Sequence, residues 1–289
     1  MGFDGLRVLS LESRRATELG RLISLQGGVP FVAPSVREIP ISENRKALGF
    51  GEQLLLNAFD LVIFMTGVGT RLLGQILETR WPNETIRQHL SNATVVARGP
   101  KPMAVLREWK VPAILVPEPN TWRDVLSTID RQPGTGPTHA ALQEYGRSAP
   151  ELLQGLQERG ICVTAVPVYH WALPLNIEPL EQAVRKLAAR EFDVVLFTAS
   201  IQVDHLLRIA DDLNLSAAVR LGLHHAVIAS IGPTMSKTLR DLDLPADFEP
   251  SHPKMGFLVG EAAQTARNLL RTKRDLDTEL QTSPPPSID

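Results

Sequence analysis

The chain repeats part of its own sequence at a constant offset of 133 residues, since Phe59-Asp60 recurs as Phe192-Asp193 and Gly99-Pro100 recurs as Gly232-Pro233. The same offset relates Glu18-Leu19 to Glu151-Leu152, Gly27 to Gly160 and Pro34 to Pro167, while Thr66 lies one place off this register from Thr198. A register held over such a span without net insertion indicates an ancient duplication. Two similar units facing each other would form a cleft, and small ligands usually bind in clefts between domains.

The composition is that of an ordinary globular protein. A length of 289 residues allows two domains, each with its own core. The net charge of -2 argues against a general nucleic-acid binder. The single cysteine, Cys162, rules out a disulfide framework and a cysteine-built metal site, and it suits a reducing cytosol. No apolar stretch approaches the roughly 20 residues of a membrane helix. We therefore expect a cytoplasmic protein without membrane or nucleic-acid partners and without a bound metal.

Short apolar runs alternate with helical patterns in both halves. Residues 61–65 and 194–198 are continuous hydrophobic runs, which are typical of parallel strands buried on both faces. Residues 94–97 and 227–231 are the next predicted strands, and each runs into a Gly-Pro pair that favours a helix start. The alternation predicts an α/β protein with two similar parallel-sheet α/β domains. Cys162 opens a further predicted strand, and we expect it to be a small buried residue.

The loops that follow the predicted strands are the expected ligand contacts, because open parallel sheets bind ligands at the carboxyl ends of their strands. These loops are rich in hydroxyls, glycines and cations and poor in carboxylates. That composition suits an anionic ligand, since N–H and hydroxyl groups bind carboxylate or phosphate oxygens and arginine adds bidentate pairing. The candidate binding residues are Thr66, Gly67, Thr70, Arg98, Thr198, Ser200, Gly232, Thr234, Ser236 and Lys254.

Sharper motifs are missing from the sequence. Gly67-Val68-Gly69 supplies two glycines of a dinucleotide fingerprint, but the third position is Leu72. No Gly-Lys-Ser/Thr phosphate loop and no Gly-x-Ser-x-Gly elbow occurs. His224 and His225 are adjacent, so their side chains point in different directions and do not predict a metal site. A plainer role stays open for Thr66 and Thr198, whose hydroxyls could cap helices instead of binding a ligand.

Several segments, taken in order, resemble uroporphyrinogen-III synthase over about residues 6–266. They are VVLFTAS, IASIGPTMSKTL, the pair Val168-Tyr169 and the hydrophobic run after each Phe-Asp pair, and the segments LQEYGRSAPELL, VPVYHWALP and HPKMG resemble a bacterial branch. The resemblance implies two α/β domains joined by a two-stranded connection near residues 36–40 and 167–171, with an active-site cleft between the domains. Residues 1–37 and 172–266 would form one domain, residues 41–166 the other, and residues 267–289 a C-terminal helix and disordered tail. The repeated halves would then have exchanged their first strand–helix–strand pieces.

The resemblance also implies an activity. The family closes linear hydroxymethylbilane into uroporphyrinogen III, with inversion of ring D and loss of water, and it uses no cofactor or metal. This implies a monomeric lyase of tetrapyrrole and heme biosynthesis in which Tyr169 assists the loss of water. Four departures leave an alternative open, namely a non-catalytic paralogue that binds a tetrapyrrole or another polyanion. In one of them, the loop that usually reads Thr-Ser-x-Asn-Gly in the family reads Thr66-Gly67-Val68-Gly69-Thr70 here. Met235 follows Thr234 where the family has a second threonine, Lys101-Pro102 lacks hydroxyls, and Glu12 stands where arginine is frequent.

Overall fold

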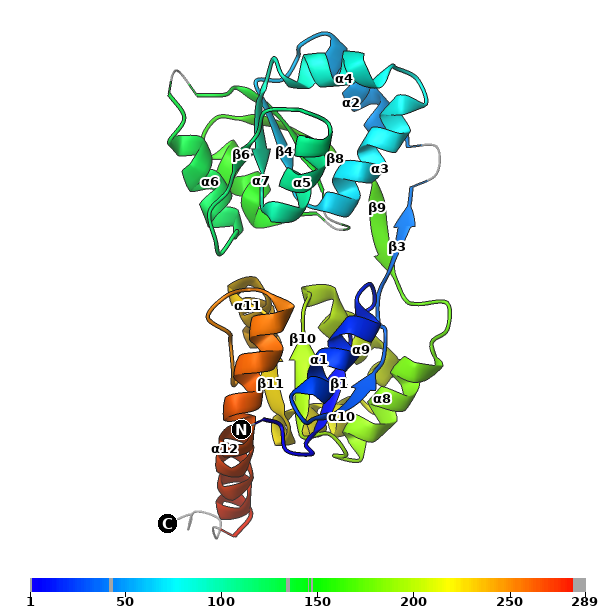
Figure 1. Ribbon diagram of the computed structural model, residues 1–289, viewed down its shortest axis with the longest axis vertical. Coiled ribbons are helices and arrows are strands. Elements are labelled where there is room, and N and C mark those ends of the chain that lie inside the picture. Colours follow the sequence, from blue (N-terminus) through cyan, green and yellow to red (C-terminus); the bar gives the residue numbers. More distant parts are fainter. Residues whose placement is uncertain (1, 42–43, 134–135, 145, 147, 283–289) are drawn as a thin grey trace, which may run out of the picture. The chain divides into compact units, whose positions relative to one another are not determined.

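The computed structural model describes residues 2–41, 44–133, 136–144, 146 and 148–282, with side chains described as far as Asp275. The chain divides into two compact units, unit 1 with Met1–Arg37 and Leu173–Asp289, and unit 2 with Glu38–Ala172 (Figure 1). The strands β3 (Arg37–Pro40) and β9 (Tyr169–Ala172) pair in a two-stranded sheet, and the chain passes from one unit to the other at the ends of these strands. The expected tail at residues 283–289 lies outside the described residues.

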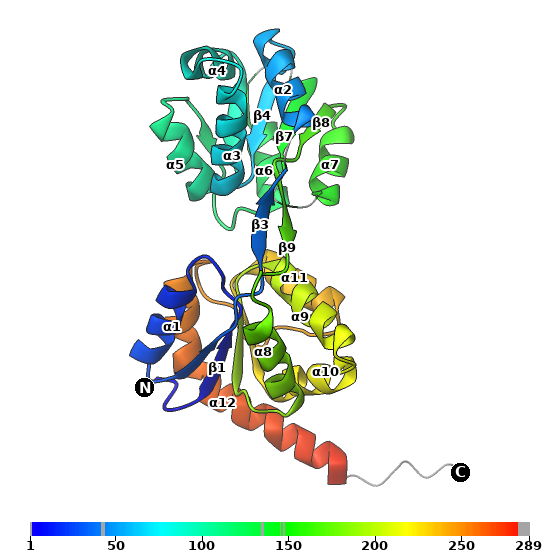
Figure 2. The same cartoon turned by 90° about the vertical axis from the view of Figure 1, so that its right-hand side faces the viewer.

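Unit 1 is built on a four-stranded parallel sheet in the order β11-β10-β1-β2. Its strands are β1 (Arg7–Ser10), β2 (Val29–Val32), β10 (Val194–Phe197) and β11 (Val227–Ser230). Helices cover both faces of this sheet (Figure 2). Apolar side chains of two helices pack against one face, and those of four helices pack against the other. The first face carries α1 (Ala16–Leu25) and α12 (Met255–Thr282), and the second carries α8 (Glu178–Ala188), α9 (Ser200–Asp212), α10 (Ser216–His225) and α11 (Pro233–Asp241).

Unit 2 is built on a five-stranded parallel sheet in the order β6-β5-β4-β7-β8. Its strands are β4 (Leu61–Phe64), β5 (Thr94–Ala97), β6 (Ile114–Leu115), β7 (His139–Gln143) and β8 (Cys162–Val166). The cores on its two faces are completed by α2 (Arg45–Leu55), α3 (Gly67–Glu78), α4 (Asn83–Leu90) and α5 (Pro100–Glu108) on one side, and by α6 (Trp122–Asp130) and α7 (Pro150–Gln157) on the other. The predicted parallel α/β architecture is confirmed.

Each sheet combines strands from both sequence repeats. The strands β1 and β2 join β10 and β11 of the second repeat, whereas β7 and β8 join β4 and β5 of the first. The exchange of the first strand–helix–strand pieces, which the resemblance implied, is therefore confirmed. Gly27 and Gly160 end equivalent helices with the same positive φ of 74°, a conformation that glycine adopts without steric cost.

One expectation about the core is wrong. Cys162 is exposed rather than buried. The physical reason is its position, because β8 is an edge strand of its sheet and Cys162 is the first residue of that strand. An apolar strand pattern does not distinguish an edge strand from a central one.

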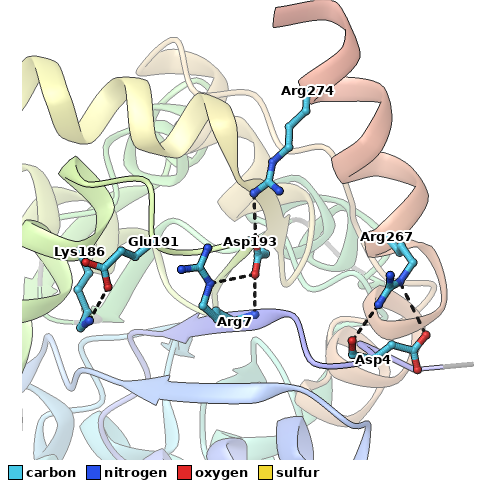
Figure 3. A network of polar contacts seen from close by, with 7 residues as sticks. All are labelled: Asp4, Arg7, Lys186, Glu191, Asp193, Arg267 and Arg274. Atoms are coloured by element: carbon cyan, nitrogen blue, oxygen red, sulfur yellow. Dashed lines mark hydrogen bonds and ion pairs between the residues drawn. The ribbon is translucent and has the colours of Figure 1, made fainter. Parts of the chain in front are cut away.

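The two repeated aspartates have the same backbone role in the two units. Asp193 precedes β10 and accepts hydrogen bonds from the Arg7 backbone amide at 2.8 Å, the Arg7 Nε at 3.3 Å and an Arg274 Nη at 2.9 Å (Figure 3). Asp60 precedes β4 and accepts from the amides of Thr138 and His139 at 2.9 and 3.0 Å. Each carboxylate thus fixes the start of the neighbouring exchanged strand. Asp193 also ties α12 to the sheet.

The hydrogen bonds shift the acidity of both carboxyls. Burial raises the pKa of Asp193, but the hydrogen bonds from Arg7 and Arg274 together outweigh it and hold the pKa below its ordinary value. The backbone amides of Thr138 and His139, with the Thr138 hydroxyl, lower the pKa of Asp60. Both carboxylates are therefore bound in their charged form.

Candidate functional site

In unit 2, the strand-end loop after β4 brings two hydroxyls together. Thr66 is the N-cap of α3, and its Oγ1 accepts a hydrogen bond from the Gly69 amide at 3.0 Å. The same oxygen lies 3.3 Å from the hydroxyl of Tyr169, whose side chain is only 2% exposed. The predicted capping role of Thr66 is confirmed, and the residue lies in the strand-end loop after β4. The two hydroxyls come from the end of β4 and from β9.

Close packing explains the glycines of this loop. A Cβ on Gly67 would lie 2.9 Å from the Lys101 carbonyl oxygen, so the first turns of α3 and α5 meet there. A Cβ on Gly69 would collide with the amide group of Gln143. The Gln143 Oε1 accepts from the amides of Met65 and Thr66 at 3.2 and 3.3 Å, and it holds the loop against the end of β7.

Two other candidates of unit 2 bond within the protein. Thr70 is buried, and its hydroxyl donates to the Thr66 carbonyl oxygen at 2.7 Å. Arg98 follows β5, and its Nε donates to the Asn120 carbonyl oxygen at 2.9 Å. The N-cap Gly99 of α5 makes no side-chain cap. Pro100 and Pro102 have no backbone N–H group, so Lys101 supplies one of the few N–H donors in the first turn of α5.

In unit 1, the loop after β10 is organised around Thr198. Its hydroxyl donates to the Glu12 Oε2 at 2.6 Å, and its oxygen accepts from the Gln202 Nε2 at 2.8 Å. The Gln202 Oε1 in turn accepts from the amides of Thr198 and Ala199 at 2.7 and 3.2 Å. Gln202 therefore fixes the start of α9 by accepting from two backbone amides, as Gln143 fixes the loop before α3.

The Gly-Pro loop after β11 starts α11 and carries the remaining hydroxyls. Gly232 is the N-cap, and a Cβ there would lie 3.2 Å from the Cβ of Pro253. Ser236 is buried and donates to the Glu249 carboxylate. Ser200 accepts from the Thr238 hydroxyl at 2.9 Å. Thr234 is exposed in the first turn of α11, and Lys254 is exposed just before α12.

Three glutamates lie at or near the strand ends of the two sheets. Glu12 and Glu249 bond to hydroxyls at the carboxyl edge of the unit 1 sheet, and Glu144 directly follows β7 in unit 2. Burial raises the pKa of Glu144, against the opposing effects of the Lys46 charge and a hydrogen bond from Ser148. The position of Glu12 after a predicted strand could be read from the sequence. Glu249 instead follows a strand-like segment after α11, which forms a single bridge between Phe248 and Ala229 and which the sequence did not predict.

Two cavities lie apart from these loops. One, of about 490 Å³, lies between α6 and α7 beside Trp122 and Gly155. The other, of about 510 Å³, lies beside α12 and is lined by Arg267, Arg271 and Arg274. Neither is lined by a candidate site residue. Within the described part of the chain, no helix is both long and apolar enough to span a membrane.

The parallel sheets and their hydroxyl-bearing strand-end loops define a two-unit α/β protein, a class in which ligands usually bind at the carboxyl ends of the strands. A sequence profile of the family Uroporphyrinogen-III synthase HemD matches residues 17–260. The chain belongs to this family, and the resemblance seen in the sequence is confirmed.

The relatives are distant. YjjA of Bacillus subtilis (strain 168), an uncharacterised protein, is 27% identical over 267 residues, which are 91% of this chain and 97% of YjjA. A mutant uroporphyrinogen III synthase of the extremely thermophilic bacterium Thermus thermophilus has a similar structure, with a TM-score of 0.67 and 24% identity over 93% of this chain and all of that chain. The wild-type form of that synthase gives a TM-score of 0.52 and 26% identity, over 96% of this chain and all of that chain.

Proposed function

We propose that the protein is a uroporphyrinogen-III synthase, which closes hydroxymethylbilane into uroporphyrinogen III with inversion of ring D and loss of water. Membership of the family supports the reaction class. The observation that carries the proposal is the hydroxyl pair of Tyr169 and Thr66, 3.3 Å apart at the N-terminus of α3. We further propose that the protein is a cytoplasmic monomer that works without a cofactor.

The hydroxyl pair is suited to the loss of water. When the C–O bond of the terminal hydroxymethyl group breaks, the departing oxygen must gain a proton to leave as water, and a positioned hydroxyl can supply it. A threonine hydroxyl has one proton and can accept two hydrogen bonds. If Thr66 accepts from the Gly69 amide and from Tyr169, its own proton stays available to the substrate. In this role the buried Tyr169 replaces the proton that Thr66 gives up.

The rest of the catalytic task is positional. The open-chain substrate is flexible and also cyclises unaided to the wrong isomer, so the protein must favour one ring closure by orientation. The candidate contacts for the substrate as a whole are the strand-end residues Thr66, Gly67, Thr70, Arg98, Thr198, Ser200, Gly232, Thr234, Ser236 and Lys254. Uncapped helix starts at Gly99 and Gly232 support anion binding in each unit.

A second function is favoured by one observation. Thr198 and Ser236 donate their protons to Glu12 and Glu249, so two expected carboxylate donors are engaged within the protein. A non-catalytic paralogue that binds a tetrapyrrole would tolerate this loss better than a synthase. The resemblance does not separate the two, because both would share the fold.

A coupled assay separates these functions. Hydroxymethylbilane is generated in situ, this protein is added, and the oxidised products are separated by isomer. A dominant type III isomer is expected, and Thr66→Val should reduce it. Type I product alone, formed at the spontaneous rate in the presence of folded protein, would refute the synthase and favour the binding protein.

A further inference from the structure

Glu12 is a fixed carboxylate at the strand-end loop of unit 1. Its Oε2 accepts from the Thr198 hydroxyl at 2.6 Å, and its Oε1 accepts from the Arg15 amide at 3.2 Å. Thr198 also accepts from Gln202, so its only proton is committed to Glu12. A ligand carboxylate that approached Thr198 would find no donor there and would meet a like charge. The Thr198 hydroxyl therefore does not offer the donor that an anionic group requires.

The neighbouring loop repeats the arrangement. The Ser236 hydroxyl donates to the carboxylate of Glu249, an exposed residue. Two hydroxyls that would suit an anion are thus both satisfied by glutamates of the same unit. A single such pair would be ordinary on a surface, but two on adjacent strand-end loops place two hydrogen-bonded carboxylates at this edge.

The internal repeat shows that the position of Glu12 is not isolated. Val8 of β1 pairs with Val194, and Ala140 of β7 pairs with Leu61, the repeat mate of Val194. Counting forward four residues from each gives Glu12 and Glu144. Both units therefore place a glutamate within two residues of the carboxyl end of the equivalent strand, β1 or β7. In unit 2 the positive charge of Lys46 offsets the negative charge of Glu144. In unit 1 Glu12 accepts hydrogen bonds from two neutral donors, the Arg15 amide and the Thr198 hydroxyl.

We propose that Glu12 is a specificity-determining residue, which accepts N–H groups of a bound tetrapyrrole and repels its carboxylates. A carboxylate has about four acceptor sites, and the Thr198 and Arg15 donors use two of them. Pyrrole N–H groups are suitable donors for the remainder. Like charges brought together at an interface disfavour the wrong partner strongly. The inference rests on the proposed tetrapyrrole function and specifies which chemical face of that ligand the unit 1 edge takes.

The test compares two porphyrins that share the ring but differ in charge. Binding of uroporphyrin I, which has eight carboxylates, and coproporphyrin I, which has four, is measured by fluorescence with the wild-type protein, Glu12→Gln and Glu12→Lys. We expect the ratio of the uroporphyrin Kd to the coproporphyrin Kd to fall roughly tenfold in Glu12→Gln and further in Glu12→Lys. The effect should shrink when the salt rises from about 0.05 to 0.5 M, because screening weakens it.

The matched control is Asp212→Asn, which removes one negative charge from the last residue of α9, at the opposite end of that helix from Thr198. Its Kd ratio should equal that of the wild type. Thermal unfolding of each variant shows whether the loop change has damaged the fold. A salt-independent loss of affinity for both porphyrins would assign Glu12 a merely structural role.

The outcomes separate this inference from the proposed function. Unchanged Kd ratios in Glu12→Gln and Glu12→Lys, with type III product still formed by the wild type, would overturn the inference alone. No binding of either porphyrin by any form, together with only type I product, would overturn both. A lowered ratio supports the inference even if no type III product forms, because the binding-protein alternative also takes a tetrapyrrole.

Discussion

Removal of the Asp193 carboxylate should destabilise unit 1 far more than removal of its repeat mate Asp60 destabilises unit 2. The Asp193 side chain is 10% exposed, and it satisfies the Arg7 amide and two guanidinium groups. In Asp193→Ala the Arg7 amide loses its partner, and α12 loses its link through Arg274 (Figure 3). Asp60 makes comparable bonds to backbone amides, but its site is exposed.

The magnitude follows from these contacts. A hydrogen bond to a charged group contributes roughly 1.5–3 kcal/mol, and an exposed ion pair contributes about 0–1 kcal/mol. The side chains of Arg7 and Arg274 are 47% and 36% exposed, so water can replace much of the hydrogen bonding that they lose with the Asp193 carboxylate. We expect Asp193→Ala to lower the free energy of unfolding of unit 1 by about 3 kcal/mol. For Asp60→Ala we expect about 1 kcal/mol after allowance for solvent screening.

The chain offers a natural way to follow the two units separately. Its four tryptophans, Trp81, Trp109, Trp122 and Trp171, all lie in unit 2. In urea unfolding, tryptophan fluorescence therefore reports unit 2, and far-UV circular dichroism reports both units. Asp193→Ala should move part of the dichroism transition by about 1 M urea and leave the fluorescence midpoint in place. Equal midpoint shifts for Asp193→Ala and Asp60→Ala would refute the reasoning.

The pH dependence gives an independent check on Asp193. Because its pKa is lowered in the folded state, its contribution is complete above the unfolded-chain pKa of about 4 and is lost as the pH falls through the lower folded-state pKa. The difference in stability between wild type and Asp193→Ala should therefore narrow only in acid. A difference that stays constant down to the acid transition would contradict the charge-based account.

Three further outcomes are expected. Tyr169→Phe should reduce turnover about 100-fold while it changes substrate binding little, and equal losses in kinetics and binding would count against its role. Because the pKa of Glu144 is raised, its contribution is present below about pH 4 and is lost as the pH rises through the folded-state pKa. Glu144→Gln should thus flatten the pH dependence of the fluorescence midpoint, and an unchanged slope would argue otherwise. Gly222→Ala should cost about 1–3 kcal/mol, because its Cβ collides with the Leu187 carbonyl oxygen. Gly260 lies in α12 with open space around it, so Gly260→Ala should raise the free energy of unfolding by about 0.5–1 kcal/mol. Unfolding followed by circular dichroism measures both glycine variants, and effects of the same sign would contradict this packing argument.

The sequence predicted the elements of the fold well where the physics is local. Continuous hydrophobic runs identified β4 and β10, and Gly-Pro pairs marked the starts of α5 and α11. Strand order is a different matter, since β1 pairs with the nearby β2 on one side, and nothing in β1 itself shows that its other neighbour is β10. The exchange between repeats came only through the family resemblance. Exposure at Cys162 was mispredicted for the same reason, because the edge of a sheet is a tertiary property.

The candidate site was predictable in its composition but not in its bonding. Thr66 was expected both as a cap and as a loop hydroxyl, and it lies beside Tyr169 across 103 residues of sequence. The glutamine supports at Gln143 and Gln202 went unnoticed, although Gln202 stands three residues after the cap of α9, a position where glutamine often bonds back to the helix start. The pairing of Thr198 with Glu12 depends on the β1–β10 contact and could not be read from either segment.

The exchange of strands also sets an order in which the protein can be made. Every strand of the unit 2 sheet has left the ribosome soon after Val166 has been synthesised, so this sheet can close while translation continues. The first strands of unit 1, β1 and β2, are made earliest but must wait for β10 and β11, which end at Ser230. The N-terminal segment therefore spends most of synthesis without its partners, and contacts of such long sequence separation form slowly. A chain interrupted after Ala172 would hold a complete second unit and only the first strand–helix–strand piece of the other.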